Sequence, residues 1–197
     1  MPKTLLKKKA KVKRPPTTDM KGLQCVMGSV FLLIMRLLLT EGLASTMLLL
    51  ASLFLAAGFI RWRKRTPLWG AGIAGAAVML AGAAAEFWSY TAGNSFGVLT
   101  LHTIMTVLVT AGAILSMLIA ANTAAHICRE ERDEKTEGIL LQRRWWIGIG
   151  YALCGGWTVF DLLTGLYPNI GLVMRLAAII INVFFLSALF QVRGLIE

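Results

Sequence analysis

Two apolar runs that meet at a short turn near the C-terminus constrain this chain more than any other feature. The runs cover about residues 145–166 and 170–191, and the turn between them reads Tyr-Pro-Asn. Each run is long enough to cross the hydrocarbon core of a bilayer, which takes roughly 20 apolar residues. One charged residue interrupts the outer part of each run, Asp161 in the first and Arg175 in the second. The pattern predicts an antiparallel transmembrane hairpin with two opposite charges at similar depth.

The rest of the chain repeats this plan. Of its 197 residues, 57% are hydrophobic, and the mean hydropathy is +0.69. A soluble domain of this size could not bury so much apolar surface, whereas a bilayer solvates it. We expect an all-α membrane protein with a single domain over residues 22–192 and six transmembrane helices arranged as three antiparallel hairpins. The expected helices cover about residues 23–40, 43–60, 68–90, 97–122, 145–166 and 170–191.

The formal net charge of +10 is distributed unevenly along the chain. Apart from Arg36 and Arg175, the basic residues lie in the N-terminal tail, in segments 61–65 and 126–144, or near the C-terminus. The alternate connections, at 40–42, 91–96 and 167–169, contain no Lys or Arg. This asymmetry follows the positive-inside rule of membrane proteins. It predicts a multi-pass protein of the cell membrane, with both termini and the two basic segments in the cytoplasm.

The basic tail over residues 1–21 is polar and contains two adjacent prolines, so we expect it to be disordered. In one interpretation it mainly sets the topology. In the other it contacts anionic lipid at the cytoplasmic surface, where each basic residue contributes about 1 kcal/mol. Nucleic-acid binding is disfavoured because the positions of the charges track the membrane topology. Segment 126–144 mixes both signs of charge, which is typical of a solvated helical extension, and it is also the candidate docking surface for a cytoplasmic energising or partner subunit.

Ionisable residues recur near the predicted outer ends of five helices. Spacings of three, four or seven residues place further polar or aromatic side chains on the same helix faces. Such single stripes indicate an internal polar core rather than charges that reach lipid headgroups. The candidate set is Arg36, Glu86, His102, Asp161 and Arg175, with Glu41, Thr106, Trp157 and Asn182 as lesser members.

Two interpretations of this set compete. In the structural interpretation the arginines neutralise Glu86 and Asp161, and the ion pairs specify helix packing without necessarily adding stability. In the functional interpretation the set lines an outward-facing site for a small charged or zwitterionic solute, with His102 as a proton-sensitive member. In either case we expect Asp161 and Arg175 to share one hydrogen-bonded cluster, with Arg36 and Glu86 as a second opposite-sign couple.

The sequence contains no complete motif of a catalytic or cofactor site. There is no HExxH, P-loop or CxxCH pattern, and the GxSxG match at residues 93–97 lies in an expected connection between two transmembrane helices rather than at a strand-to-helix turn. The three cysteines show no metal-ligand spacing, and His102 and His126 lie at opposite ends of one predicted helix. We therefore expect neither an enzyme nor a bound metal or cofactor.

Small residues are concentrated in the predicted helix 68–90. They form small-xxx-small pairs, which let a neighbouring helix backbone approach closely. We favour packing inside the bundle over a homodimer face for this stripe. The pairs are Ala71/Gly75, Gly72/Ala76 and Ala81/Ala85.

The hydropathy layout from about residue 23 to 191, with six short helices and an outer polar site, is broadly similar to that of the substrate-binding subunits of vitamin-uptake transporters. The three-hairpin plan also resembles small bacterial stress membrane proteins of the HdeD type. Neither likeness rests on a sequence motif, so no residue role is carried over. The first resemblance implies a transporter or a solute-binding transporter subunit. The second implies a structural or stress-related protein without a ligand, whose intramembrane charges are packing ion pairs.

Overall fold

The fold is known from a computed structural model, which describes residues 18–39, 41–92, 98–164 and 168–196. All regular structure in this part of the chain is helical, and each of the six helices is long and apolar enough to cross a membrane. This confirms the predicted all-α class, with six helices that could span a membrane, and it is compatible with a polytopic membrane protein. The helices are α1 (Thr18–Leu38), α2 (Glu41–Arg61), α3 (Trp69–Ala92), α4 (Val98–Glu130), α5 (Glu134–Thr164) and α6 (Pro168–Ile196).

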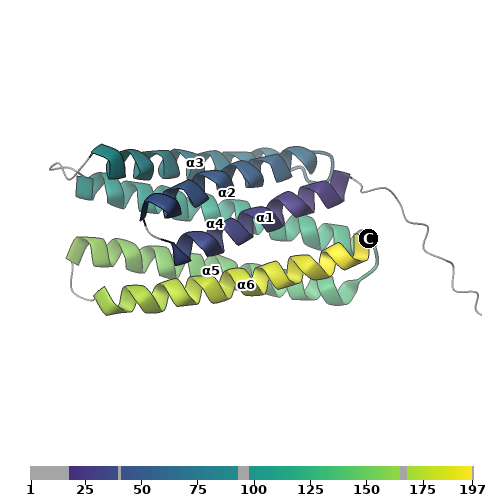
Figure 1. Cartoon of the computed structure of the whole chain (residues 1–197). Helices are drawn as coiled ribbons and strands as arrows, with labels where there is room; N and C mark the ends of the chain where they lie inside the picture. Colours follow the sequence, from purple (N-terminus) through teal and green to yellow (C-terminus); the bar gives the residue numbers. More distant parts are fainter. Residues whose placement is uncertain (1–17, 40, 93–97, 165–167, 197) are drawn as a thin grey trace, which may run out of the picture.

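The helices are arranged so that each one packs against the next one in the chain (Figure 1). In addition, α6 packs against α1, which brings the first and last helices together. Successive helices run in opposite directions, so that α1 begins and α6 ends at the same end of the bundle (Figure 1). The short connections 62–68 and 131–133 lie at that end as well. We call it the basic end, because Arg61, Arg63, Arg65 and Arg132 lie there.

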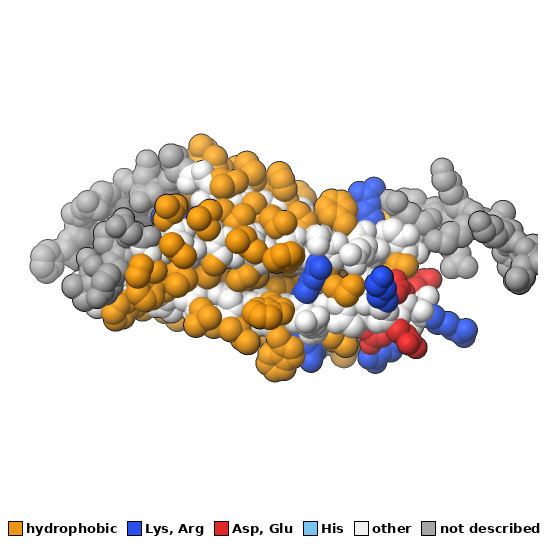
Figure 2. Space-filling model, turned by 90° about the horizontal axis from the view of Figure 1, so that it is seen from below, with side chains coloured by type: hydrophobic (Ala, Val, Ile, Leu, Met, Phe, Trp, Pro, Cys, Tyr) orange, Lys and Arg blue, Asp and Glu red, His pale blue; other side chains and the backbone are white. Residues whose placement is uncertain are grey.

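The surface divides into an apolar band and a charged end. Figure 2 shows hydrophobic side chains over most of one face, and Lys, Arg, Asp and Glu side chains gathered toward the basic end. Large apolar side chains such as Leu153, Leu163, Leu172 and Phe184 are more than half exposed in the isolated chain. In a soluble protein this surface would be a severe liability, whereas lipid covers it in a membrane.

The half of the bundle nearest the basic end contains a closely packed core. Phe59 of α2 and Trp62, the residue that follows α2, are fully buried, together with Met117 of α4 and Leu189 of α6. The rings of Phe59 and Trp62 meet edge to face with their centroids 6.4 Å apart. The buried indole Nε1–H of Trp62 donates a hydrogen bond to the carbonyl oxygen of Asp19 (3.2 Å). Apolar side chains from several helices therefore fill this half of the bundle.

Helices α4 and α5 extend toward the basic end beyond the expected spans 97–122 and 145–166, in agreement with the helical extension that the mixed charges of segment 126–144 indicated. They continue through most of segment 126–144, and only residues 131–133 separate them. Arg132 has a left-handed backbone (φ 59°), and the Arg132 and Asp133 N–H groups donate to the Arg129 and Cys128 carbonyls. This is the hydrogen-bond pattern of a Schellman motif, which ends α4. Asp133 then caps α5, because its Oδ1 accepts a hydrogen bond from the Thr136 N–H (3.1 Å).

The small residues of α3 divide between the interior and the surface. Gly72, Gly75 and Ala76 are buried, whereas Ala81 is exposed. A Cβ atom added to Gly112 of α4 would lie 2.6 Å from the carbonyl oxygen of Gly75. The stripe around Gly75 thus permits close approach of α3 and α4 inside the bundle, as we favoured, while the Ala81 end of the stripe does not contribute.

Candidate functional site

A cavity of about 750 Å³ lies in the half of the bundle opposite the basic end. Side chains from all six helices line it. On α6 the lining runs from Gly171 to Asn182, a depth of about 16 Å at 1.5 Å per residue. The cavity therefore reaches roughly half of the way through a hydrocarbon core of about 30 Å.

Four of the five principal candidate residues lie on the wall of this cavity. Arg36 comes from α1, Glu86 from α3, Asp161 from α5 and Arg175 from α6. Both signs of charge are thus present in one space, contributed by four different helices. The side chain of the fifth residue, His102, lies outside the part of the chain that the structure describes.

Arg36 and Glu86 form an ion pair across the bundle. The guanidinium Nη2 lies 3.1 Å from Oε2 and 3.4 Å from Oε1 of the carboxylate. The two side chains are 27% and 22% exposed, so the pair is partly accessible from the cavity. The sequence analysis expected these residues to be an opposite-sign couple, although they are 50 positions apart and α1 and α3 are separated along the chain by α2.

Asp161 and Arg175 both line the cavity but form no ion pair with each other in the described structure. Asp161 is partly buried and Arg175 is exposed. The expectation that the two residues share one hydrogen-bonded cluster stays a prediction. The antiparallel arrangement sets the depth of each residue, whereas the rotation of each helix about its own axis decides where the side chain points.

Three of the four lesser candidates also line the cavity, namely Thr106, Trp157 and Asn182. Asn182 is 2% exposed, and its Nδ2 donates to the carbonyl oxygen of Ala178 (2.8 Å). Its Oδ1 accepts a hydrogen bond from the hydroxyl of Tyr151 (2.7 Å). This bond joins α5 to α6 at the deep end of the cavity. The side chain of Glu41, the fourth lesser candidate, is outside the described residues.

Tyr151 and Thr158 also line the cavity but were not among the predicted site residues. Both could have been found from the spacing, because Tyr151, Cys154, Thr158 and Asp161 follow one another at steps of three and four residues on α5. The true lining of α5 is broader than one stripe.

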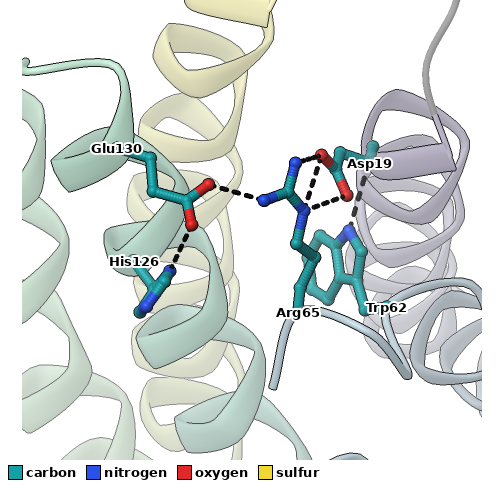
Figure 3. Close-up of polar contacts among 5 residues, drawn as sticks. All are labelled: Asp19, Trp62, Arg65, His126 and Glu130. Carbon is teal, nitrogen blue, oxygen red and sulfur yellow. Dashed lines mark hydrogen bonds and ion pairs between the residues drawn. The ribbon is translucent and has the colours of Figure 1, made fainter.

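The basic end is closed by a polar network that lies outside the cavity lining (Figure 3). Arg65, in the connection between α2 and α3, donates from Nε to both carboxylate oxygens of Asp19 (3.0 and 2.9 Å). Its Nη1 donates to Oε2 of Glu130 (2.7 Å), and His126 Nδ1 lies 3.6 Å from Oε1 of the same carboxylate. The hydrogen bond to Asp19 is the main cause that raises the pKa of Arg65 above its usual value. The network ties the start of α1, the α2–α3 connection and the end of α4 together.

The composition of the cavity wall limits the chemistry that it can perform. Within the described residues, no group of three or more His, Cys, Asp or Glu side chains could hold a metal ion. The wall offers a carboxylate, Asp161, and a guanidinium, Arg175, that are not paired with each other. Tyr151 and Trp157 add aromatic surface. Such a wall suits a small solute that carries charge of one or both signs.

Comparisons of the chain with protein-family models, with curated proteins and with solved structures found no match. The likenesses to vitamin-uptake subunits and to HdeD-type proteins therefore rest on the hydropathy layout alone.

Proposed function

We propose that this chain is a cell-membrane protein that binds a small charged or zwitterionic solute in the cavity, as a transporter or as the solute-binding subunit of one. The observation that carries the proposal is the cavity of about 750 Å³ whose wall presents Asp161 and Arg175 without an ion pair between them. Ligand sites in proteins commonly occupy roughly 300–1,000 Å³ and combine apolar lining with a few polar groups. The cavity falls within that range.

Charged side chains at membrane depth need partners. An ionised side chain within a transmembrane segment costs a few kcal/mol or more unless a partner or water solvates it. Arg36 and Glu86 reduce this cost because they form an ion pair with each other. Asp161 and Arg175 do not pair with each other, so water or a solute in the cavity must solvate them. A zwitterion would satisfy both at once, with its cationic group at Asp161 and its anionic group at Arg175.

The two halves of the bundle support access from one side. The cavity lies opposite the basic end, where the packed core and the Arg65 network close the bundle. On the positive-inside rule the basic end is cytoplasmic, and the solute then approaches from outside the cell. Transport would require this closed half to open, or a partner subunit that drives the opening. The exposed charges around the α4–α5 turn, including His126 and Arg129, are the proposed docking surface for that subunit.

A second candidate function rests on a different observation. The Arg36–Glu86 ion pair shows that part of the intramembrane charge is neutralised internally. If Asp161 and Arg175 also serve only to hold water and position helices, the chain is a structural or stress-related membrane protein without a ligand. The two candidates differ in whether the cavity has a solute that stabilises the fold.

The test is a thermal-unfolding screen of the purified chain in mild detergent against amino acids, betaines, polyamines and small carboxylates. A solute present at about 100 times its Kd stabilises the fold by about 2.7 kcal/mol, a clear rise in Tm. We expect Asp161→Asn and Arg175→Gln each to remain monodisperse and to lose this rise. The matched controls are Glu131→Gln and Arg63→Gln, which remove the same charges at exposed positions of the basic end.

Two outcomes separate the candidates. A rise in Tm that disappears in both cavity variants and persists in both controls supports solute binding. No stabilising solute in the screen, together with loss of folded yield in Asp161→Asn, supports the structural alternative.

Co-purification in the same detergent tests the partner. An ATPase or other energising subunit that binds the wild type, and is lost when His126 and Arg129 are both replaced by Ala, supports the transporter assignment.

A further inference from the structure

A second hollow lies on the outside of the bundle, between α4 and α5. It has a volume of about 440 Å³, and residues from these two helices line it. Asn122, Arg144 and Trp145 lie at the end nearer the basic end, while Ile114 and Ile149 lie deeper. From Asn122 to Ile114 the groove is about 12 Å long at 1.5 Å per residue. It is thus polar at one end and apolar along its length.

Among the residues that the structure describes, the cation at the polar end of the groove has no carboxylate partner. The Nη1 of Arg144 donates to the neutral Oδ1 of Asn122 (2.8 Å), and its guanidinium carbon lies 5.7 Å from the ring centroid of Trp145. No described ion pair includes Arg144. Asn122 and Trp145 therefore orient the charge and leave it available to an anion. Contacts with a neutral amide and an indole ring orient the guanidinium without neutralising its charge.

The depth of Arg144 matches a membrane surface. Arg144 lies about 20 residues before Thr164, where its span ends on the side opposite the basic end. Asn122 lies about as many residues after Thr103, where the α4 span begins on that same side. Both residues consequently lie where the hydrocarbon core ends on the basic side. Trp145 and Trp146, each 64% exposed, have the exposure and position of an interfacial aromatic belt.

We propose that this groove is a binding site for one anionic phospholipid of the leaflet at the basic end. The lipid phosphate accepts hydrogen bonds from the Arg144 guanidinium, and an acyl chain lies along Leu118 and Ile149. The unneutralised cation at headgroup depth and the apolar groove beneath it match the two parts of a phospholipid. Basic pockets between helices on the cytoplasmic side of membrane proteins bind anionic headgroups in this way. This site is separate from the solute cavity and does not depend on the proposed function.

The neighbouring Arg143 provides a matched control. It has the same charge and lies one residue from Arg144, but it is not part of the groove lining. Its Nη1 donates to Ser187 Oγ (2.8 Å) and to the carbonyl oxygen of Phe184, both on α6. A general attraction between interfacial arginines and anionic lipid would involve both residues equally. A groove site requires Arg144 in particular.

The experiment is a titration of the full chain with phosphatidylglycerol, followed by native mass spectrometry in a mild detergent. Phosphatidylcholine with the same acyl chains is the zwitterionic comparison, and inorganic phosphate is the competitor that has no chain. We expect one phosphatidylglycerol to be retained preferentially. Arg144→Gln should weaken this binding about tenfold, the effect of one charge-assisted contact, while Arg143→Gln should change it less than about twofold.

A second variant tests the apolar part of the site. A Cβ added to Gly148 would meet only Leu118 Cδ2, at 3.7 Å, so Gly148→Leu should fold and fill the groove. It should weaken phosphatidylglycerol binding while Arg144 is intact. The proposal is overturned if Arg143→Gln and Arg144→Gln weaken binding equally, if phosphatidylcholine is retained as well as phosphatidylglycerol, or if Gly148→Leu has no effect. Displacement of the lipid by millimolar inorganic phosphate would assign the site to a free anion and also overturn it.

Discussion

The Arg36–Glu86 pair is the intramembrane contact whose energetic role can be argued most directly. Its side chains remain 27% and 22% exposed, so water in the cavity screens part of the attraction. Breaking a fully buried pair by removing one partner costs about 3–5 kcal/mol, whereas exposed surface pairs contribute about 0–1 kcal/mol. This pair lies between those limits. Its main effect is to hold α1 and α3 at one relative position.

Replacing Glu86 by Gln should therefore destabilise the fold by about 1–3 kcal/mol, because Arg36 loses its carboxylate partner within the membrane. The double variant Arg36→Gln/Glu86→Gln should recover part of this loss. Thermal unfolding in detergent measures both. The matched control is Glu137→Gln, which breaks an ion pair with the exposed Arg129 and should cost less than about 1 kcal/mol. Equal losses for Glu86→Gln and Glu137→Gln would contradict the argument.

Asp133 makes stability depend on pH at the α4–α5 turn. Hydrogen bonds from the hydroxyl and N–H of Thr136 lower the pKa of its carboxyl group. A carboxyl whose folded pKa is lowered contributes stability that is fully present above the unfolded pKa, about 3.9, and is lost as the pH falls through the folded pKa. The carboxylate should thus stabilise the fold at neutral pH and stop doing so in acid.

The corresponding experiment compares Tm between pH 7 and pH 3 in the wild type, Asp133→Asn and Asp133→Ala. The Ala variant should be less stable at pH 7 because it lacks the cap, and its difference from the wild type should shrink in acid. The Asn variant keeps a capping oxygen that does not titrate, so it should be close to the wild type at pH 7. A difference between wild type and Ala that stays constant down to pH 3 would show that the Asp133 charge does not matter.

The close approach of α3 and α4 depends on glycine residues, which have no Cβ atom. Added to Gly112, a Cβ would lie 2.6 Å from the Gly75 carbonyl oxygen and 2.9 Å from the Met79 backbone nitrogen. Backbone atoms cannot move aside as a flexible side chain can. Ser116 strengthens the same interface, because its buried hydroxyl donates to the Gly72 carbonyl oxygen (3.2 Å).

The variant Gly112→Ala should consequently separate α3 from α4 and destabilise the fold by about 1–3 kcal/mol, the usual cost of overpacking. Gly156→Ala on α5 is the control, because a Cβ there meets nothing within 4 Å, and it should be neutral or slightly stabilising. Folded yield and Tm in detergent give the comparison. Similar behaviour of the two variants would mean that the interface can relax around a methyl group.

At the scale of the whole molecule, the orientation in the membrane is the prediction with the widest consequences. We expect a single cysteine at Glu134 to react with an impermeant thiol reagent from the cytoplasmic side, and one at Asn94 from outside. Asn94 lies outside the described residues, in the connection between α3 and α4. The background replaces Cys25, Cys128 and Cys154. Labelling of both positions from the same side would refute the topology.

Much of this architecture follows from local properties of the sequence. A run of about 20 apolar residues must cross the membrane as a helix, because hydrocarbon offers no partner to backbone N–H and C=O groups. Position along such a run sets the depth of a charge, which is why Arg36, Glu86, Asp161 and Arg175 could be assigned to one level. The helical repeat, which places side chains three, four or seven residues apart on one face, likewise put Asn182 and Trp157 on inward faces.

Two other features depend on packing between helices. The packing of α6 on α1 and the choice of Glu86 as the partner of Arg36 depend on which helices are neighbours and how each is rotated about its axis. Hydropathy contains no information on either, because lipid and a neighbouring helix are equally apolar surroundings. The Arg65 network likewise joins residues that are distant in the chain. Asp19 lies 46 positions before Arg65, and Glu130 lies 65 positions after it. Hydropathy alone thus predicted six helices long enough to cross a membrane and the position of each charge along them, whereas packing between helices selects which charges meet.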